Sequence, residues 1–291
     1  MKIGLAIGDF TWPSGPSQLG PELAAVARAA DTSGYDSLWV MDHFFQIRML
    51  GPVENEMLEG YTTLAFLAGI TSRVQLGTQV TGVHYRHPGV VLLKIVTTLD
   101  VLSGGRAALG IGAGWNEGES RALGVPFPTT SERFEQLEET LQIAHQMWKG
   151  DESPYEGKHF HLDRPLNSPQ SLQRPHPPIL VGGGGEKKTL RLVAQYADAC
   201  NIFPGPDMTH KLDVLRAHCD AVGRDYDEIQ KTTAYWEPIE FTDQGIEQVA
   251  EKLADYAKLG IQAVHMSIRE SHRADLVQQL GERLIPAVAD F

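Results

Sequence analysis

The strongest candidate for acid–base chemistry is the pair Asp42–His43, which follows the apolar run Ser37–Met41. A histidine side chain has an ordinary pKa of about 6.5, so it can donate or accept a proton near neutral pH. A carboxylate beside it can fix which ring nitrogen carries the proton, although neighbouring residues of a strand point to opposite faces of a sheet. We therefore predict catalytic roles for His43 and Asp42. The alternative is a structural histidine that bonds a backbone carbonyl.

A second candidate is the run Gly182–Gly185, which precedes a predicted helix that opens with Glu186, Lys187 and Lys188. Consecutive glycines let backbone N–H groups approach an anion, and a helix N-terminus favours negative charge. Two lysines in a first helical turn oppose the usual preference for acidic residues there, and a bound phosphate would offset their charge. The run therefore predicts a phosphate site. The alternative is a flexible turn with solvated lysines.

A third segment, Gly110–Asn116, has glycine at every second position in front of Trp115. Small residues at a strand end leave room for a planar ring system beside the aromatic side chain. Tight strand–helix packing is the alternative, because it also selects glycine. We predict no metal site, since His159 and His161 lie close together without a third ligand. We interpret Tyr85–Pro88 as the approach to a helix and not as a catalytic segment.

Eight short apolar runs, rich in β-branched residues, alternate with amphipathic helical patterns along the chain. Such runs are typical of strands buried on both faces of a parallel sheet. We predict an α/β fold, a (β/α)₈ TIM barrel, whose working face is the carboxyl end of the strands. A doubly wound sheet is the alternative, but no G-x-G-x-x-G turn follows the first run. The predicted strands are Ile3–Ile7, Ser37–Met41, Val74–Thr81, Ala107–Gly112, Ile179–Gly182, Ala199–Phe203, Lys231–Trp236 and Ala263–Ile268.

The interval between the fourth helix and the fifth strand is too long for a simple connection. Thr129 and Glu132 predict a capping box at the start of that helix, and Gly150 predicts its end. Residues of about 150–178 are rich in Pro, Ser, His and Asp, which predicts an inserted loop with a short hairpin at Lys158–Leu162. The whole chain, 1–291, is expected to form one domain.

Composition limits the classes of partner. The chain has 291 residues and a formal charge of −12, which disfavours nucleic acid because a phosphate backbone requires a basic surface. Only Cys200 and Cys219 are present, so we expect free thiols in a reducing compartment. The first residues do not resemble a signal peptide, and no apolar run approaches the roughly 20 residues that span a bilayer. We predict a soluble, cytoplasmic protein that acts on a small molecule.

Several stretches, in the same order, resemble the luciferase-like monooxygenase superfamily. Gly34–Phe44 resembles the second-strand signature of that superfamily, and Val74–Thr78 with Arg86–Pro88 downstream continues the match. The most specific stretch is Thr98–Arg106, which leads into Gly110–Glu119, and Pro177–Gly183 follows it. The resemblance therefore covers nearly the whole chain.

The resemblance implies a barrel with an inserted segment, often dimeric, that holds FMN or the deazaflavin coenzyme F420 at its carboxyl face. It implies that Gln79–Val80 is a non-proline cis peptide behind the coenzyme ring. It also implies that Asp42 contacts the coenzyme and that His43 is the proton donor or base. The other positions that we expect to contact the coenzyme or its phosphate are Gly82, Ala113, Gly114, Trp115, Asn116, Gly182, Gly183, Gly184, Gly185 and Phe203.

One departure bears on the substrate. The sugar-phosphate dehydrogenases of this superfamily carry a catalytic glutamate where Trp115 stands, and Glu117 and Glu119 lie in a different register. The sequence is most similar to deazaflavin-dependent members. We predict F420-dependent hydride transfer to or from a small organic substrate that stacks on the ring under Trp12, Phe44 and Trp115, with His43 exchanging a proton. The alternatives are an FMN-dependent monooxygenase supplied by a separate reductase, and a coenzyme-binding protein without catalysis.

Overall fold

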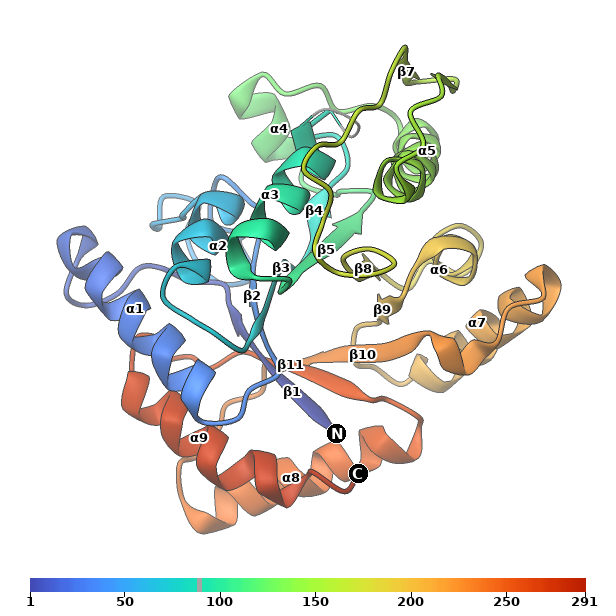
Figure 1. Cartoon of the computed structure of the whole chain (residues 1–291). Helices are drawn as coiled ribbons and strands as arrows, with labels where there is room; N and C mark the ends of the chain where they lie inside the picture. The colour runs from blue at the N-terminus through green and yellow to red at the C-terminus, as the bar shows by residue number, and fades with distance from the viewer. Residues whose placement is uncertain (88–90) are drawn as a thin grey trace.

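A closed barrel of parallel strands forms the centre of the molecule, and helices surround it (Figure 1). The computed structural model describes residues 1–87 and 91–291. The sheet has the order β3-β2-β1-β11-β10-β9-β8-β5-β4, and pairing between β3 and β5 closes it. Because β3 and β4 are two parts of one predicted strand, these nine pieces make eight barrel strands. The predicted (β/α)₈ fold is confirmed, with strands β1 (Lys2–Ile7), β2 (Ser37–Val40), β3 (Gln75–Thr78), β4 (Thr81–Gly82), β5 (Ala107–Gly112), β8 (Ile179–Gly182), β9 (Ala199–Asn201), β10 (Gln230–Tyr235) and β11 (Ala263–Met266).

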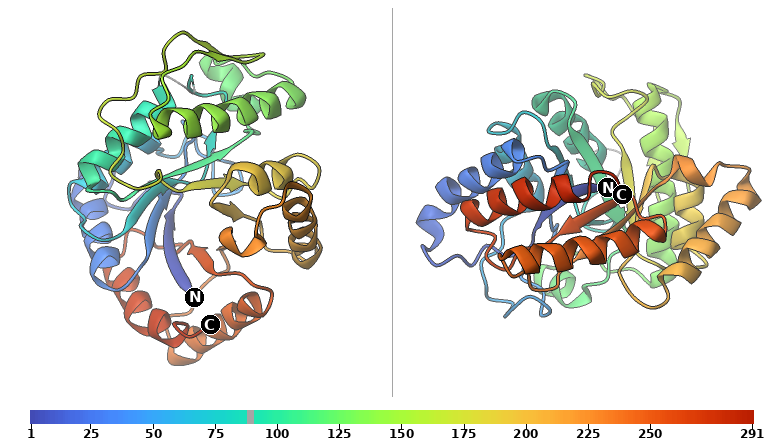
Figure 2. Two further views of the ribbon diagram at one scale, coloured as in Figure 1. Left: turned by 45° about the vertical axis from the view of Figure 1, so that its right-hand side comes forward. Right: turned by 90° about the horizontal axis from the view of Figure 1, so that it is seen from below.

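The helices bury one face each against the outside of the barrel. The two chain ends lie side by side (Figure 2), and the amino group of Met1 donates to the carbonyl oxygen of Val288 at 2.7 Å. The long helix α5 has the predicted capping box of Thr129 and Glu132 and ends at Gly150, whose φ of 80° suits glycine. The helices are α1 (Pro16–Thr32), α2 (Gly60–Ala68), α3 (Leu93–Ser103), α4 (Glu117–Leu123), α5 (Thr130–Lys149), α6 (Thr189–Tyr196), α7 (Met208–Val222), α8 (Asp243–Lys258) and α9 (Ala274–Ala287).

The inserted segment lies where the sequence predicts it, between α5 and β8. Its hairpin consists of β6 (Tyr155–Glu156) and β7 (His161–Leu162), so the predicted hairpin at 158–162 covers its turn and second strand only. Two buried carboxylates fasten the segment to the barrel: Glu139 of α5 accepts from the backbone amides of residues 158–160, and Asp100 of α3 accepts from those of residues 172–173. The segment is therefore an integral part of the outer wall.

The third predicted strand is interrupted. The sequence predicts a continuous strand at 74–81, but β3 ends at Thr78 and β4 begins at Thr81, with a cis peptide bond between Gln79 and Val80. The side chain of Val80 lies against two glycines of the neighbouring strands, because a Cβ at Gly112 or Gly182 would come within 3.2 or 2.9 Å of its methyl groups. A Cβ at Gly110 would lie 1.7 Å from the carbonyl oxygen of Thr78. These glycines therefore allow close packing between strands, and the coenzyme contact expected at Gly182 stays a prediction.

One tryptophan fills the barrel interior. Trp39 of β2 stacks on the ring of His265 of β11, with ring centroids 4.5 Å apart. A Cβ at Gly77 would lie 2.5 Å from the Trp39 ring, so glycine at that position makes space for the indole. The interior below the carboxyl face is therefore packed and does not form a channel.

Candidate active site at the carboxyl face of the barrel

The loops after β2 and β4 and the first turn of α4 bring together a histidine, a tyrosine and a carboxylate. Nδ1 of His43 lies 2.9 Å from Oε2 of Glu119, and the hydroxyl of Tyr85 donates to the same oxygen. The other oxygen of Glu119 accepts from the backbone amides of Phe44 and Phe45. Glu119 thus joins the loop after β2 to the first turn of α4.

The hydrogen bonds to Glu119 fix its charge. Burial raises the pKa of this carboxyl, but the hydrogen bonds from His43, Tyr85 and the Phe45 amide outweigh burial and hold the pKa below its ordinary value. An ionised carboxylate can only accept, so the proton of a neutral His43 ring resides on Nδ1. The described residues leave Nε2 of His43 without a partner, and this atom is available for proton exchange with a bound substrate.

Asp42 does not pair with His43, in line with the expectation that neighbouring residues of a strand point to opposite faces. Both oxygens of the buried Asp42 accept from the guanidinium of Arg86, with Nη2 at 2.9 Å from Oδ1. Within residues 1–87 and 91–291, neither oxygen bonds to His43. Arg86 also pairs with Glu59, the N-cap of α2, and lies over the ring of Tyr61 at 4.9 Å. Asp42 therefore anchors the loop that carries His43.

The segment interpreted as a helix approach contributes more to the site than the sequence indicated. Its Tyr85 and Arg86 hold Glu119 and Asp42, whereas Pro88 lies outside the described residues. His84 bonds the hydroxyl of Ser120 through Nε2 at 3.0 Å, and burial lowers the pKa of its ring to about 4. The neutral His84 packs against the chain at Gly114, where a Cβ would lie 2.4 Å from its Cε1 atom.

This packing revises the interpretation of the small residues after β5. Gly114 has a φ of 76°, which favours glycine, and a Cβ at Gly82 would lie 3.0 Å from the His84 ring. Ala113 accepts from Nε of Arg133 through its carbonyl oxygen at 3.1 Å. Asn116 caps α4 by accepting from the amide of Glu119 at 3.2 Å. These residues shape the loop through packing and capping, so direct coenzyme contacts at them stay a prediction.

Three large aromatic side chains are exposed at the same face. Trp115, Phe203 and Trp236 follow β5, β9 and β10 and are 60%, 57% and 46% exposed. The ring of Trp115 meets that of His43 edge-on at 5.5 Å, and Phe203 and Trp236 are 5.7 Å apart. Exposed aromatic residues at a barrel's carboxyl face offer an apolar surface to a planar ligand. Trp12, by contrast, is buried, and its indole N–H donates to the carbonyl oxygen of Asp9.

The side chain of Gln79 belongs to a polar chain inside the barrel. Its amide oxygen lies 3.1 Å from Nδ1 of His265, and its amide nitrogen donates to Asn201 at 3.1 Å. Asn201 in turn donates to the hydroxyl of Thr232. Burial lowers the pKa of His265 to about 3, so this ring is neutral and donates through Nδ1. The side chain of Gln79 is therefore committed to this polar chain, and a coenzyme contact at Gln79 stays a prediction.

The glycine run lies at the carboxyl end of β8, but the predicted helix start at Glu186 is wrong: α6 begins at Thr189, so Lys187 and Lys188 do not lie in its first turn. Gly183 has a φ of 114° and donates its N–H to the carbonyl oxygen of Asn201 at 3.0 Å. Lys188 is directed to α5, where Nζ lies 3.2 Å from the hydroxyl of Ser131. Lys187 is exposed and has no ion-pair partner in the described part of the chain. The interpretation that these two lysines face a phosphate at the run is not supported.

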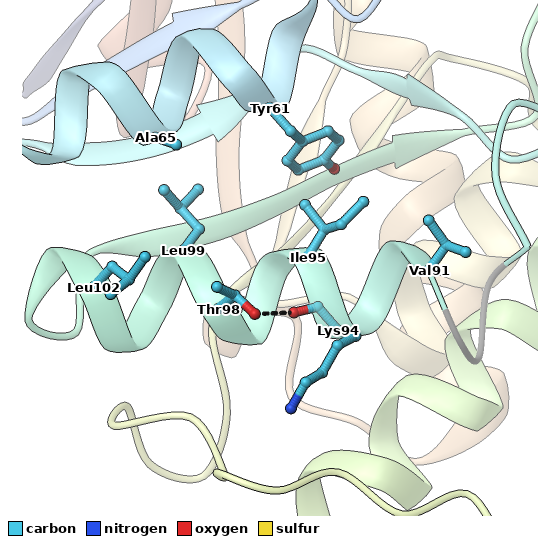
Figure 3. A pocket seen from close by; sticks show the side chains of 8 residues that line it. All are labelled: Tyr61, Ala65, Val91, Lys94, Ile95, Thr98, Leu99 and Leu102. Atoms are coloured by element: carbon cyan, nitrogen blue, oxygen red, sulfur yellow. Dashed lines mark hydrogen bonds between the residues drawn. The ribbon is translucent and has the colours of Figure 1, made fainter.

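An apolar groove lies elsewhere, on the outside of the barrel between α2 and α3 (Figure 3). It does not include His43 or Glu119. Among the described residues, no helix is both long and apolar enough to cross a bilayer. Cys200 and Cys219 are buried and free, as expected. The residues that could take part in acid–base chemistry therefore lie at the carboxyl face and not in this groove.

The fold and this cluster define the chain as a (β/α)₈ barrel with a histidine–carboxylate pair at its carboxyl face. The luciferase-like monooxygenase family model matches residues 1–238, and the chain belongs to this family. An F420-dependent glucose-6-phosphate dehydrogenase of Kineococcus radiotolerans is 32% identical over 277 residues, which cover 91% of this chain and 79% of that protein.

Solved structures share the fold at low identity. The F420-dependent tetrahydromethanopterin reductase of Methanopyrus kandleri superimposes with a TM-score of 0.79 at 18% identity, covering 98% of both chains. An F420-dependent secondary alcohol dehydrogenase in complex with an F420–acetone adduct gives 0.81 at 16% identity, covering 99% of both chains. At these identities the likeness concerns the fold alone.

Proposed function

We propose that the protein is an F420-dependent oxidoreductase in which His43 exchanges a proton with a small organic substrate. The observation that carries the proposal is the His43–Glu119 pair, which leaves Nε2 of the imidazole without a partner among the described residues. The names of the relatives support the choice of coenzyme. When bound, F420 supplies hydride chemistry, and the chain supplies placement and proton exchange.

The backbone and aromatic groups at the carboxyl face fit such a coenzyme. The cis peptide Gln79–Val80 follows β3, and the exposed Trp115 and Phe203 follow β5 and β9. In the part of the chain that the structure describes, the amides of Gly184 and Gly185 donate to no protein acceptor. Unpaired N–H groups beside an apolar aromatic surface suit a planar ring that carries a phosphate. These residues would hold the ring and the phosphate.

Glu119 assists His43 in both directions of reaction. It accepts the Nδ1 proton, and its negative charge stabilises the imidazolium that forms when Nε2 takes a proton. Arg86 and Asp42 fix the start of the same loop, and the amides of Phe44 and Phe45 fix its continuation on Glu119. The loop is thus held at both ends of His43, which limits the freedom of the ring.

The substrate that suits this face is uncharged and partly apolar. Trp115 meets the His43 ring, where a sugar phosphate would require polar partners. Arg86, which holds the residue before His43, is committed to Asp42 and Glu59. An alcohol or a carbonyl compound with an apolar substituent matches these surroundings better than glucose 6-phosphate does. Assays with cyclic and branched secondary alcohols, with glucose 6-phosphate as the comparison, test this choice.

We also infer that two copies associate through the α2–α3 groove. The groove is lined by Tyr61, Ala65, Val91, Lys94, Ile95, Thr98, Leu99 and Leu102 (Figure 3). Leu102 is strongly exposed, and Phe66 lies on the neighbouring helix. The ammonium of Lys94 donates to the carbonyl oxygen of Ser168 in the inserted segment. Leu102→Asp should convert a dimer into a monomer in light scattering, and a monomeric wild type would refute the inference.

The function is tested by titrating the purified protein with F420 and with FMN, followed by assays of His43→Asn. The asparagine amide nitrogen can replace Nδ1 as a donor to Glu119, but the substitution removes Nε2. We expect F420 binding to persist and turnover to fall by about 10²- to 10⁴-fold. Preference for FMN and oxygen uptake would instead favour a monooxygenase with a separate reductase. Unchanged turnover in His43→Asn would refute the role of the histidine, and coenzyme binding without turnover in wild type would favour a binding protein.

A further inference from the structure

A lysine from a distant part of the chain lies on the glycine run. A Cβ built on Gly184 would lie 3.0, 3.1 and 3.2 Å from Cδ, Nζ and Cε of Lys211, which belongs to α7. The outer half of the lysine side chain therefore rests on the run, in space that any other residue at 184 would contest. This contact could not be expected from the sequence, because α6 and β9 separate the two segments.

Lys211 is held there by one weak partner. Its side chain is only 21% exposed, and its ammonium lies 2.6 Å from a carboxylate oxygen of Asp207, one helical turn earlier. Asp207 itself is more than half exposed, and a solvated i,i+4 pair of this kind is easily exchanged for another anion. The lysine is thus preorganised over the run by packing, whereas its charge remains available.

The backbone supplies further donors at the same place. The amide of Gly183 is used within the barrel, but those of Gly184 and Gly185 have no acceptor among the described residues. Lys188 is turned to Ser131, and Lys187 is exposed. Lys211 is the cation that the described structure places on the run, next to two unpaired amides. A phosphate oxygen is an acceptor that suits both kinds of donor.

We propose that Lys211 binds the coenzyme phosphate at Gly184–Gly185 and exchanges its contact with Asp207 for this phosphate. The proposal rests on the proposed coenzyme function and assigns it a residue that sequence reasoning placed elsewhere. It also explains the smallness of residue 184, since the lysine and the phosphate both need to reach the backbone there.

The test separates the phosphate from the rest of the coenzyme. Fluorescence titrations measure the Kd of three ligands: the deazaflavin ribitol chromophore without phosphate, the form that ends at phospholactate, and complete F420. The variants are Lys211→Met, which keeps the apolar stem, and Lys187→Met, which removes the same charge from an exposed position. Thermal unfolding checks that both variants are folded.

For Lys211→Met we expect the Kd of the phospholactate form to rise about 10- to 100-fold, as for the loss of a charge-assisted hydrogen bond. The Kd of the phosphate-free chromophore should change less than about 3-fold, and Lys187→Met should affect neither ligand more than that. Complete F420 should lose no more than the phospholactate form does.

Each other outcome overturns the assignment. Equal losses for both chromophore forms would mean that Lys211 acts through packing. A loss confined to complete F420 would place the lysine at the glutamate tail of the coenzyme. If wild type binds the phosphate-free and phospholactate forms equally, no phosphate contact exists, although the coenzyme function stands. If wild type binds none of the three, the coenzyme function falls together with the lysine assignment.

Discussion

Replacing Glu119 by glutamine tests the role of the buried carboxylate most directly. The orientation of the new amide is set by the backbone, because the amides of Phe44 and Phe45 both donate to Oε1 and require an oxygen there. The NH₂ group of Glu119→Gln then occupies the place of Oε2, facing Nδ1 of His43 and the hydroxyl of Tyr85. The NH₂ group can only donate, so His43 adopts the tautomer with its proton on Nε2.

The expected loss of kcat follows from two effects of this substitution. The tautomer with the proton on Nε2 cannot accept a proton there, and an imidazolium loses the charge that stabilises it. Together these effects should lower kcat by about 10²- to 10⁴-fold, in either direction of reaction. Charge-assisted hydrogen bonds become neutral ones, which should lower the free energy of unfolding by about 1–3 kcal/mol. The Kd of F420 should change little, because Glu119 is buried beneath the His43 loop.

The assay combines kinetics with a direct observation of the tautomer. Imidazole ¹⁵N shifts report which nitrogen of His43 is protonated, and stopped-flow measurements with the preferred substrate give the rate of the chemical step. Glu117→Gln is the matched control, since Glu117 lies on the same helix with its side chain 51% exposed and paired only with Arg121 among the described residues. Wild-type kcat in Glu119→Gln, or an unchanged Nδ1–H tautomer, would refute the reasoning.

Two further predictions concern stability. Arg86→Met leaves the buried Asp42 carboxylate unpaired and should lower the free energy of unfolding, measured by urea titration, by about 3–5 kcal/mol. The control Arg121→Met removes an exposed pair and should lower it by less than about 0.5 kcal/mol. Equal losses in the two variants would contradict the anchoring role of Asp42. Burial holds the pKa of His265 at about 3, below its unfolded value of about 6.5, so the unfolded chain binds the additional proton and stability is lost as pH falls below 6.5. The free energy of unfolding of wild type, relative to that of His265→Gln, should therefore fall by roughly 1 kcal/mol per pH unit between pH 6.5 and 4. A difference that stays constant with pH would show that His265 takes up its proton in the folded state.

The barrel was predictable because its strands are buried on both faces. Apolar runs such as Ala107–Gly112 and Ile179–Gly182 have few other uses in a chain of this length, and their observed bounds match. The break between Thr78 and Thr81 was different. Thr78, Gln79, Val80 and Thr81 continue the pattern of a strand, and only the family resemblance indicated a cis peptide there. The local sequence pattern thus predicts which segments become strands, but not where a strand is interrupted.

The location of the candidate site could be predicted from the sequence, but the contacts between its residues could not. His43 was found because it directly follows a strand, whereas Glu119 was set aside because its register differs from that of a family glutamate. Its contact with His43 depends on how far α4 turns after Asn116, and the Asn116 cap on the amide of Glu119 is the one signal in the sequence that could have indicated it. Lys211 gave no such signal, since its position on Gly184 is set by the packing of α6 on α7. Residues that follow strands can therefore be assigned to the face from sequence, while the partners that determine their protonation and charge require the helices to be in place.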